Sequence, residues 1–107
     1  MLKKFSALDC KNLSSLIFRN NILLTDIGNI PTSLTTLVFD NCDSVETLNL
    51  SNMEKLQDDG IVLGEMKNLK NFTYSHKTSK EYPSGITKLN FTSCPNIETI
   101  KAICAFA

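Results

Sequence analysis

The chain has 107 residues, of which 42% are hydrophobic and 21% charged, with four glycines and three prolines. This composition is typical of a folded chain and excludes the weakly hydrophobic class of disordered proteins, and the length indicates one domain. Eleven basic residues balance eleven acidic ones, and neither sign is concentrated in one segment. We therefore expect no nucleic-acid partner and no membrane partner, since no apolar run is long enough to span a bilayer.

The N-terminal segment MLKKFSALDC carries two lysines without an apolar stretch behind them, so it is not a secretory signal. We expect the protein to be cytoplasmic, or exported without a recognisable signal. The four cysteines, Cys10, Cys42, Cys94 and Cys104, are too widely spaced for a small disulfide scaffold. Three of them fill positions of a repeated frame, and we predict that all four are reduced and buried.

That frame reads L-x-x-L-x-L-x-x-C-x-x-L, with other apolar residues or Asn at some of its positions. Its copies start at Leu2, Leu13, Leu34, Val45, Leu69, Ile86 and Ile97. In each copy two apolar residues lie two positions apart, as Leu37 and Phe39 do, which is strand alternation with both side chains on one face. Each copy is too short to bury its apolar face alone, so the pattern predicts copies stacked around a shared core.

The connections between copies differ in character. Gly28 and Pro31 interrupt the chain after the second copy. After the fourth copy, the apolar patch Ile61 to Met66 predicts one or two helical turns, with Asp58 and Asp59 favouring the helix N-terminus. The segment SHKTSKEYPSG is the most polar in the chain and predicts a solvent-facing loop.

The last copy, Ile97 to Ala102, runs into the apolar tail ICAFA. The alternative for this region is a closing helix, because Pro95 suits a first helical turn, and Ile97, Ile100 and Cys104 would share one helical face.

The segments LTTLVFDNC, VETLNLSNM, LSSLIFRNN and ITKLNFTSC resemble the strand-and-turn part of leucine-rich repeats. The stretch LNLSNMEKLQDDGIVLGEMKNLKNF resembles the cysteine-containing class, with Met53 in the cysteine position. IPTSLTTLVF and YPSGITKLNF resemble the Pro-Ser-Leu lead-in of bacterial leucine-rich repeats. The resemblance covers nearly the whole chain. It implies an α/β or mainly β fold, a leucine-rich-repeat-like solenoid with short parallel strands and short helical or extended convex arms.

The spacing departs from that family, in which one turn takes roughly 20–29 residues, because three intervals here are only eleven. Two interpretations remain. An eleven-residue copy is a half-turn, so that each coil carries strands on two sides, or one copy of each close pair is an extended convex arm. We favour the first, since Leu24 and Ile27 offer a further half-turn. The domain spans residues 1–107, and its apolar ends predict a fragment of a longer array, or ends covered by a partner or by self-association.

The sequence contains no enzyme or metal signature that we can identify. His76 has no cysteine or carboxylate at catalytic spacing, C-x-x-C and H-E-x-x-H do not occur, and Asp58 and Asp59 lack the spacing of a calcium loop. We therefore predict a protein without enzyme activity, metal or cofactor. A small hydrolase, the less favoured alternative, would place His76 in a concave pocket beside a reactive cysteine.

Binding is the remaining class of function. On a leucine-rich-repeat-like sheet, the positions flanking the two apolar strand residues face solvent, and here they are small, polar and mixed in charge, which suits a protein surface. The candidates are Arg19, Val38, Asp40, Glu46, Asn49, Thr73, Ser75, Lys88, Asn90, Thr92, Glu98 and Lys101. We predict a protein–protein interaction module with a protein partner. A self-assembling repeat segment, associating through its apolar ends, is the structural alternative.

Overall fold

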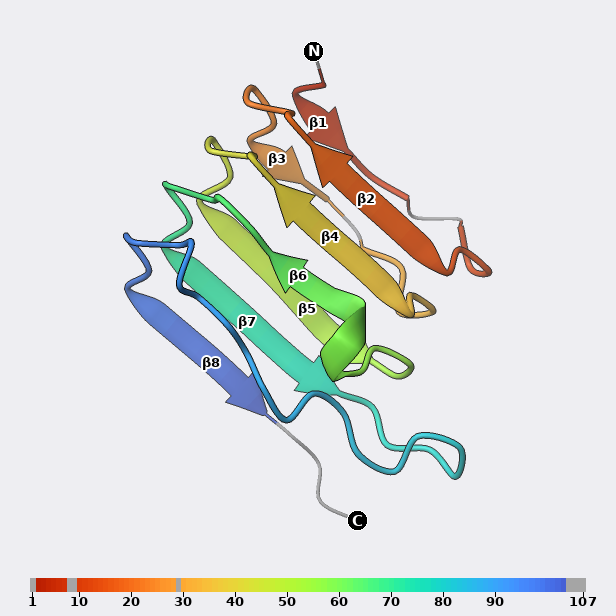
Figure 1. Cartoon of the computed structure of the whole chain (residues 1–107). Helices are drawn as coiled ribbons and strands as arrows, with labels where there is room; N and C mark the ends of the chain where they lie inside the picture. The colour runs from red at the N-terminus through yellow and green to blue at the C-terminus, as the bar shows by residue number, and fades with distance from the viewer. Residues whose placement is uncertain (1, 8–9, 29, 104–107) are drawn as a thin grey trace.

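The computed structural model describes residues 2–7, 10–28 and 30–103, with the backbone alone described for residue 103. The chain is mainly β and winds into a solenoid of about four turns (Figure 1). Its elements are β1 (Lys4–Phe5), β2 (Ser15–Arg19), β3 (Asp26–Ile27), β4 (Thr36–Asp40), β5 (Thr47–Met53), the 3-10 helix η1 (Asp58–Gly60), β6 (Ile61–Leu63), β7 (Asn71–His76) and β8 (Thr99–Ile103). Every strand pair is parallel.

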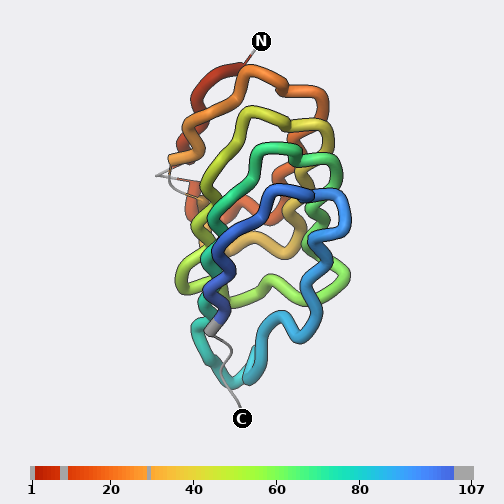
Figure 2. The backbone as a smooth tube through the Cα atoms, turned by 90° about the vertical axis from the view of Figure 1, so that its left-hand side faces the viewer, coloured from red at the N-terminus to blue at the C-terminus, as the bar shows by residue number. Residues whose placement is uncertain are grey.

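Each coil has two limbs, and the strands from β1 to β7 alternate between them along the chain, whereas β7 and β8 lie on the same limb (Figure 2). β2, β4 and β6 form one sheet. On the other limb, β1 pairs with β3, and β5, β7 and β8 form a sheet in that order, with β7 in the middle. Leu37 and Phe39 therefore lie in β4, and Leu48 and Leu50 lie in β5 on the opposite side. The first interpretation of the eleven-residue interval, in which each copy is half a coil, is confirmed.

The frame residues point inward and stack on the equivalent residues of the next coil. Leu48 aligns with Phe72, and Phe18 aligns with Phe39. All four are nearly or fully buried. The Phe18 and Phe39 rings are stacked with their centroids 5.1 Å apart. Burying a side chain of this size contributes about 1.5–3 kcal/mol, so these inward ladders are the main source of stability.

The chain turns sharply where strands end. Asn20, Asn41 and Asn52, which follow or lie near the ends of β2, β4 and β5, have φ angles of 58°, 54° and 59°. Asn tolerates this left-handed region better than most residues do. The Asn41 side-chain amide also donates to the Asn20 side-chain oxygen over 3.0 Å, which links two coils. Glu65 occupies the equivalent corner after β6, with a φ of 28°.

The helical turns expected at residues 61–66 are wrong. The last copy of the frame forms a strand over its described residues, as the frame predicts, and not the alternative closing helix. Residues 61–63 form β6, because the chain leaves η1 and pairs in register with β4; Val62 points outward and Leu63 inward. Residues 99–103 form β8, which starts where Glu98 and Thr99 donate their backbone N–H groups to the Lys70 carbonyl oxygen, 2.8 and 2.9 Å away. Short runs of β-branched residues favour this pairing.

The prediction of reduced, buried cysteines holds for two of the four. Cys42 and Cys94 are buried free thiols, whereas Cys10 is free but exposed, because its corner in the first coil has no preceding coil packed on it in the structure. Cys104, together with most of the apolar tail, lies outside the described residues.

Candidate recognition surfaces

The structure divides the predicted solvent-facing residues between two opposite surfaces. Face A is the outer surface of β2, β4 and β6, and it carries Arg19, Val38 and Asp40. Face B is the outer surface of β5, β7 and β8, and it carries Asn49, Thr73, Ser75 and Lys101. Glu46 and Glu98 directly precede β5 and β8, and Lys88, Asn90 and Thr92 lie in the irregular segment 86–92. A single face does not contain them all.

The centre of face A is a row of branched aliphatic side chains. Ile17 aligns with Val38, and Val38 aligns with Val62. Ile17 and Val62 are 51% and 47% exposed, and Val38 is partly buried between them. Because neighbouring strands lie about 4.8 Å apart, the three side chains form a continuous strip. Single exposed aliphatics are common, but contiguous ones mark contact surfaces.

Sequence reasoning identified only Val38 of this row. Ile17 occupies the same position of the frame, between the inward residues Leu16 and Phe18, so a consistent use of the frame would have found it. Val62 was missed because residues 61–66 were expected to be helical, and its outward direction follows only from strand pairing.

Two opposite charges border this row. Arg19 aligns with Asp40, directly beyond Ile17 and Val38 along the strands. Across the described residues, the ion pair within 4.0 Å is Lys70 with Glu46, so Arg19 and Asp40 are not joined in one. Both charges therefore remain available to a partner, and face A has an apolar centre with a charged rim.

The two central rows of face B are polar among the side chains that the structure describes. Asn49, Thr73 and Lys101 form one row across its strands, and Thr47, Asn71 and Thr99 form another, as the strand register shows. These side chains are exposed or, like Thr73, partly buried.

Several of the predicted residues on this side already have partners within the chain. The Ser75 hydroxyl oxygen accepts a hydrogen bond from the Asn52 backbone N–H over 2.8 Å, which holds the bulge of β5. The Glu46 carboxylate lies 3.3 Å from the Lys70 ammonium group. Both side chains of this pair are about half exposed, so we expect it to contribute roughly 0–1 kcal/mol.

The segment 86–92 is held by Asp58. One Asp58 carboxylate oxygen accepts hydrogen bonds from the backbone N–H groups of Thr87 and Lys88, over 2.6 and 3.0 Å, and the other accepts one from the Thr87 hydroxyl. The Thr87 hydroxyl, followed by these two backbone groups, lowers the pKa of the Asp58 carboxyl. Within the segment, the Asn90 side-chain oxygen accepts bonds from the Thr92 backbone and hydroxyl, 2.9 and 2.8 Å away.

The buried His76 and cysteines also contact the backbone. The two His76 ring nitrogens lie 3.0 and 2.9 Å from the carbonyl oxygens of Met53 and Tyr82, so the ring ties the polar loop after β7 to the neighbouring coil. Burial raises the pKa values of the Cys42 and Cys94 thiols, which disfavours their thiolate forms. Among the described residues, no group of three or more His, Cys, Asp or Glu side chains is placed to hold a metal ion.

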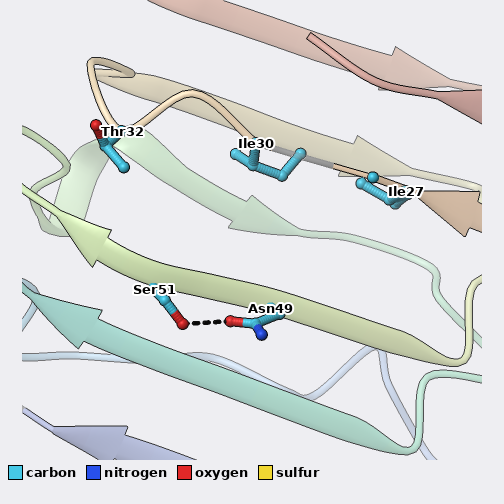
Figure 3. Close-up of a pocket in the computed structure, with 6 residues that line it drawn as sticks. Ile27, Ile30, Thr32, Asn49 and Ser51 are labelled. Atoms are coloured by element: carbon cyan, nitrogen blue, oxygen red, sulfur yellow. Dashed lines mark hydrogen bonds between the residues drawn. The ribbon is translucent and has the colours of Figure 1, made fainter. Parts of the chain in front are cut away.

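A groove of about 380 Å³ lies between the second and third coils, on the limb of face B (Figure 3). It is lined by Ile27, Gly28, Ile30, Thr32, Asn49 and Ser51. The Ser51 hydroxyl donates to the Asn49 side-chain oxygen across 2.5 Å at the β5 side of the groove. Asn49 is the one residue of the sequence-derived candidates among those that line it.

Comparisons of this chain with protein-family models, with curated proteins and with solved structures found no match. The described part of the chain also contains no helix long and apolar enough to cross a membrane.

Proposed function

We propose that this protein is a protein–protein interaction module that binds its partner through face A. The observation that carries the proposal is the in-register row Ile17, Val38 and Val62, with its outer two members about half exposed. Burying apolar area yields about 25 cal/mol per Å², so such a row favours association.

The surroundings of the row support a protein as the partner. Interfaces between proteins combine a desolvated apolar centre with a polar rim that sets orientation. Arg19 and Asp40 supply opposite charges at the rim of face A. The partner surface we expect is aliphatic at its centre, with one acidic and one basic group at its edge.

We also propose that the solenoid is a divergent leucine-rich repeat. Two features support this assignment. The apolar frame recurs along the chain, and aligned residues of successive coils, such as Lys4 with Asp26 and Leu48 with Phe72, are about 22–24 residues apart, within the range of that family. The chain departs from the resemblance in carrying strands on both limbs of most coils and in having, among its described residues, only the short helix η1.

The test of face A uses matched substitutions on the two faces. Val38→Glu places a charge in the aliphatic row, and Thr73→Glu places the same charge at an outward strand position of face B. Partners are first identified by a photo-crosslinking residue at position 17, and their affinities for each purified variant are then measured by calorimetry. We expect Val38→Glu to weaken binding by at least about tenfold, or 1.4 kcal/mol, and Thr73→Glu to leave it unchanged. Equal affinities of both variants would contradict the proposal.

Self-association through β8 is the second candidate function. Ile100 continues the inward row of Leu48 and Phe72, which are buried, yet it is 48% exposed. A further coil or a second copy of the chain would cover it. Sedimentation across a range of concentrations tests the second copy: mass should rise with concentration for the natural chain and stay monomeric for Ile100→Lys. A constant monomeric mass for both proteins would exclude it.

A further inference from the structure

The outward residues of β2 and β4 on face A are matched in their chemistry (Figure 1). Strand pairing aligns Ser15 with Thr36, Ile17 with Val38, and Arg19 with Asp40. The three pairs are two hydroxyl groups, two aliphatic groups and two opposite charges. A surface with this pattern is complementary to a copy of itself, provided that the copy is turned so that β2 faces β4.

A two-fold axis parallel to the strands, midway between β2 and β4, gives this arrangement. Each residue of β2 then faces the residue of the second copy's β4 with which it is aligned in its own sheet, and every contact occurs twice. Ile17 meets the second copy's Val38, and Arg19 meets the second copy's Asp40. Four aliphatic side chains therefore form the centre of the contact, and four alternating charges lie along one edge.

The charges favour this axis over its neighbours. An axis that runs along β4 would place the two Asp40 carboxylates opposite each other, which is repulsive. An axis across the strands at Val38 would place Arg19 opposite Ser15 and leave both charges without a counter-charge. An axis between β4 and β6 would leave Arg19 outside the contact. The axis between β2 and β4 brings each Arg19 to an Asp40.

We propose that the protein partner of face A is a second copy of this chain, bound around this axis. The inference rests on the proposed function, because it names the partner of the same face. That partner surface should be aliphatic at its centre, with one acidic and one basic group at its edge, and this describes face A itself. The eleven basic and eleven acidic residues of the chain balance, so no net charge keeps two copies apart.

The contact is small, so the dimer is weak and reversible. Two strands of five residues each cover about 17 Å by 10 Å on each copy, which is well below the area of a stable interface. We expect a dissociation constant of roughly 0.1–1 mM from such an area. β6 lies on the far side of β4 from β2, so Val62 is outside the contact.

The test exchanges the two charges and follows sedimentation of the whole chain up to about 1 mM, the upper end of this range. We expect self-association of the natural chain to be weakened at least about tenfold by Arg19→Asp and by Asp40→Arg, because each places like charges opposite each other. An equimolar mixture of the two variants should associate as tightly as the natural chain, because each supplies the charge that the other lacks. Val62→Glu and Thr73→Glu, which lie outside the contact, should leave association unchanged.

A second mixture separates this contact from general attraction between oppositely charged chains. Asp26→Arg has the same net charge as Asp40→Arg, but position 26 is exposed in β3 on the other limb. Mixed with Arg19→Asp, it should not restore association. Circular dichroism of each variant checks that it is folded. Ile17→Glu, also at an exposed position, replaces a charge variant that does not fold and should weaken association equally.

The outcomes distinguish this inference from the proposed function. A natural chain that stays monomeric up to about 1 mM would overturn the inference, and so would a monomeric mixture of Arg19→Asp with Asp40→Arg. The proposed function survives both results if another protein binds face A and loses affinity for Val38→Glu. Association that persists in Val38→Glu but is lost in Ile100→Lys would overturn the inference and assign self-association to β8.

Discussion

In the described part of the chain, strand pairing is interrupted once on each limb of the solenoid. The two interruptions differ in what connects the coils there. On the limb of face A, the ladder ends at β6, and the next segment, 86–92, is attached by the Asp58 carboxylate. On the limb of face B, the ladder is interrupted between β3 and β5, and a groove occupies the interruption. Farther along the chain, His76 also links two segments through its side chain, because its two ring nitrogens contact the carbonyl groups of Met53 and Tyr82.

The two breaks show where the hydrogen bonding between coils depends on side chains. A regular coil is held by backbone hydrogen bonds that any sequence can make, whereas an irregular one needs a particular polar side chain to satisfy the backbone groups that the ladder leaves free. Where the chain supplies such a side chain, the break is closed. Where it supplies aliphatic residues, as at Ile27 and Ile30, a groove lies beside the break.

The largest effect is expected from a substitution of Gly60, which directly precedes β6 on the limb of face A. A Cβ atom there would overlap the Thr35 carbonyl oxygen, which the backbone holds in place. The opposite limb has no ladder at this level, so we expect Gly60→Ala to cost about 3 kcal/mol of unfolding free energy, the upper part of the range for overpacking. Denaturant unfolding measures the loss.

Gly64→Ala is the matched control, because it lies in the same coil and its Cβ atom would stay 3.3 Å from the Phe39 carbonyl oxygen. We expect it to cost less than about 1 kcal/mol, close to the ordinary price of a tight contact. Similar losses of unfolding free energy for the two variants would contradict the prediction that the close contact of Gly60 with Thr35 makes this coil sensitive to an added Cβ atom.

The next effect concerns the bridge made by His76. His76→Phe keeps a buried ring but removes both ring-nitrogen contacts, while the Met53 and Tyr82 carbonyl oxygens keep their hydrogen bonds from the Lys77 and Ser79 backbone N–H groups. We expect a loss of about 0.5–1.5 kcal/mol, the net contribution of a hydrogen bond. The polar loop after β7 should also become the first site of cleavage in limited proteolysis. Thr78→Ala, in the same loop and exposed, is the control and should leave both readouts unchanged.

A smaller effect, of opposite sign, is expected at the corner after β6. Asn20 and Asn41 occupy the equivalent corner of the two preceding coils, and Glu65 adopts a positive φ there without being suited to it. Because most L-residues lose roughly 1–2 kcal/mol in the left-handed region and Asn loses less, we expect Glu65→Asn to stabilise the protein by about 0.5–1 kcal/mol. A rise in the thermal midpoint measures it, and Asn41→Ala should lower the midpoint by a similar amount.

The inward half of this fold was readable from the sequence. The frame placed Leu37, Phe39, Leu48 and Leu50 in the core. The eleven-residue interval left two interpretations, of which two strands per coil was the favoured one. Residues 61–66 misled because a run of three strand residues is too short to show a period, so the patch was taken for a helix.

The outward half was less readable, because it depends on contacts between distant parts of the chain. Asp58 bonds to Thr87 and His76 to Met53, pairs that no local spacing connects. The groove lies beside β3 and β5, which belong to different sheets although both carry ordinary frame residues. Of the predicted binding residues, the frame gave the direction of each strand position but not which of the two faces it joins.

The smallest effect is the pH dependence of stability that follows from the hydrogen bonds of Asp58 to the segment 86–92. It tests whether the charge of the Asp58 carboxylate is needed to hold this segment. The pKa of Asp58 is lowered in the folded chain by the Thr87 hydroxyl and by the backbone N–H groups of Thr87 and Lys88. A carboxyl group with a depressed folded pKa contributes stability that is fully present above its unfolded pKa, about 3.8, and is lost as the pH falls through its folded pKa.

The difference in unfolding free energy between the natural chain and Asp58→Asn should therefore be constant near pH 6 and shrink below about pH 4. Asp59→Asn is the control for the loss of one negative charge, since Asp59 is the exposed neighbour in η1. Denaturant midpoints from about pH 2.5 to 6 measure both. A difference for Asp58→Asn that does not depend on pH would mean that the amide serves the Thr87 and Lys88 backbone as well as the carboxylate does, so that the break is closed by hydrogen-bond geometry rather than by charge.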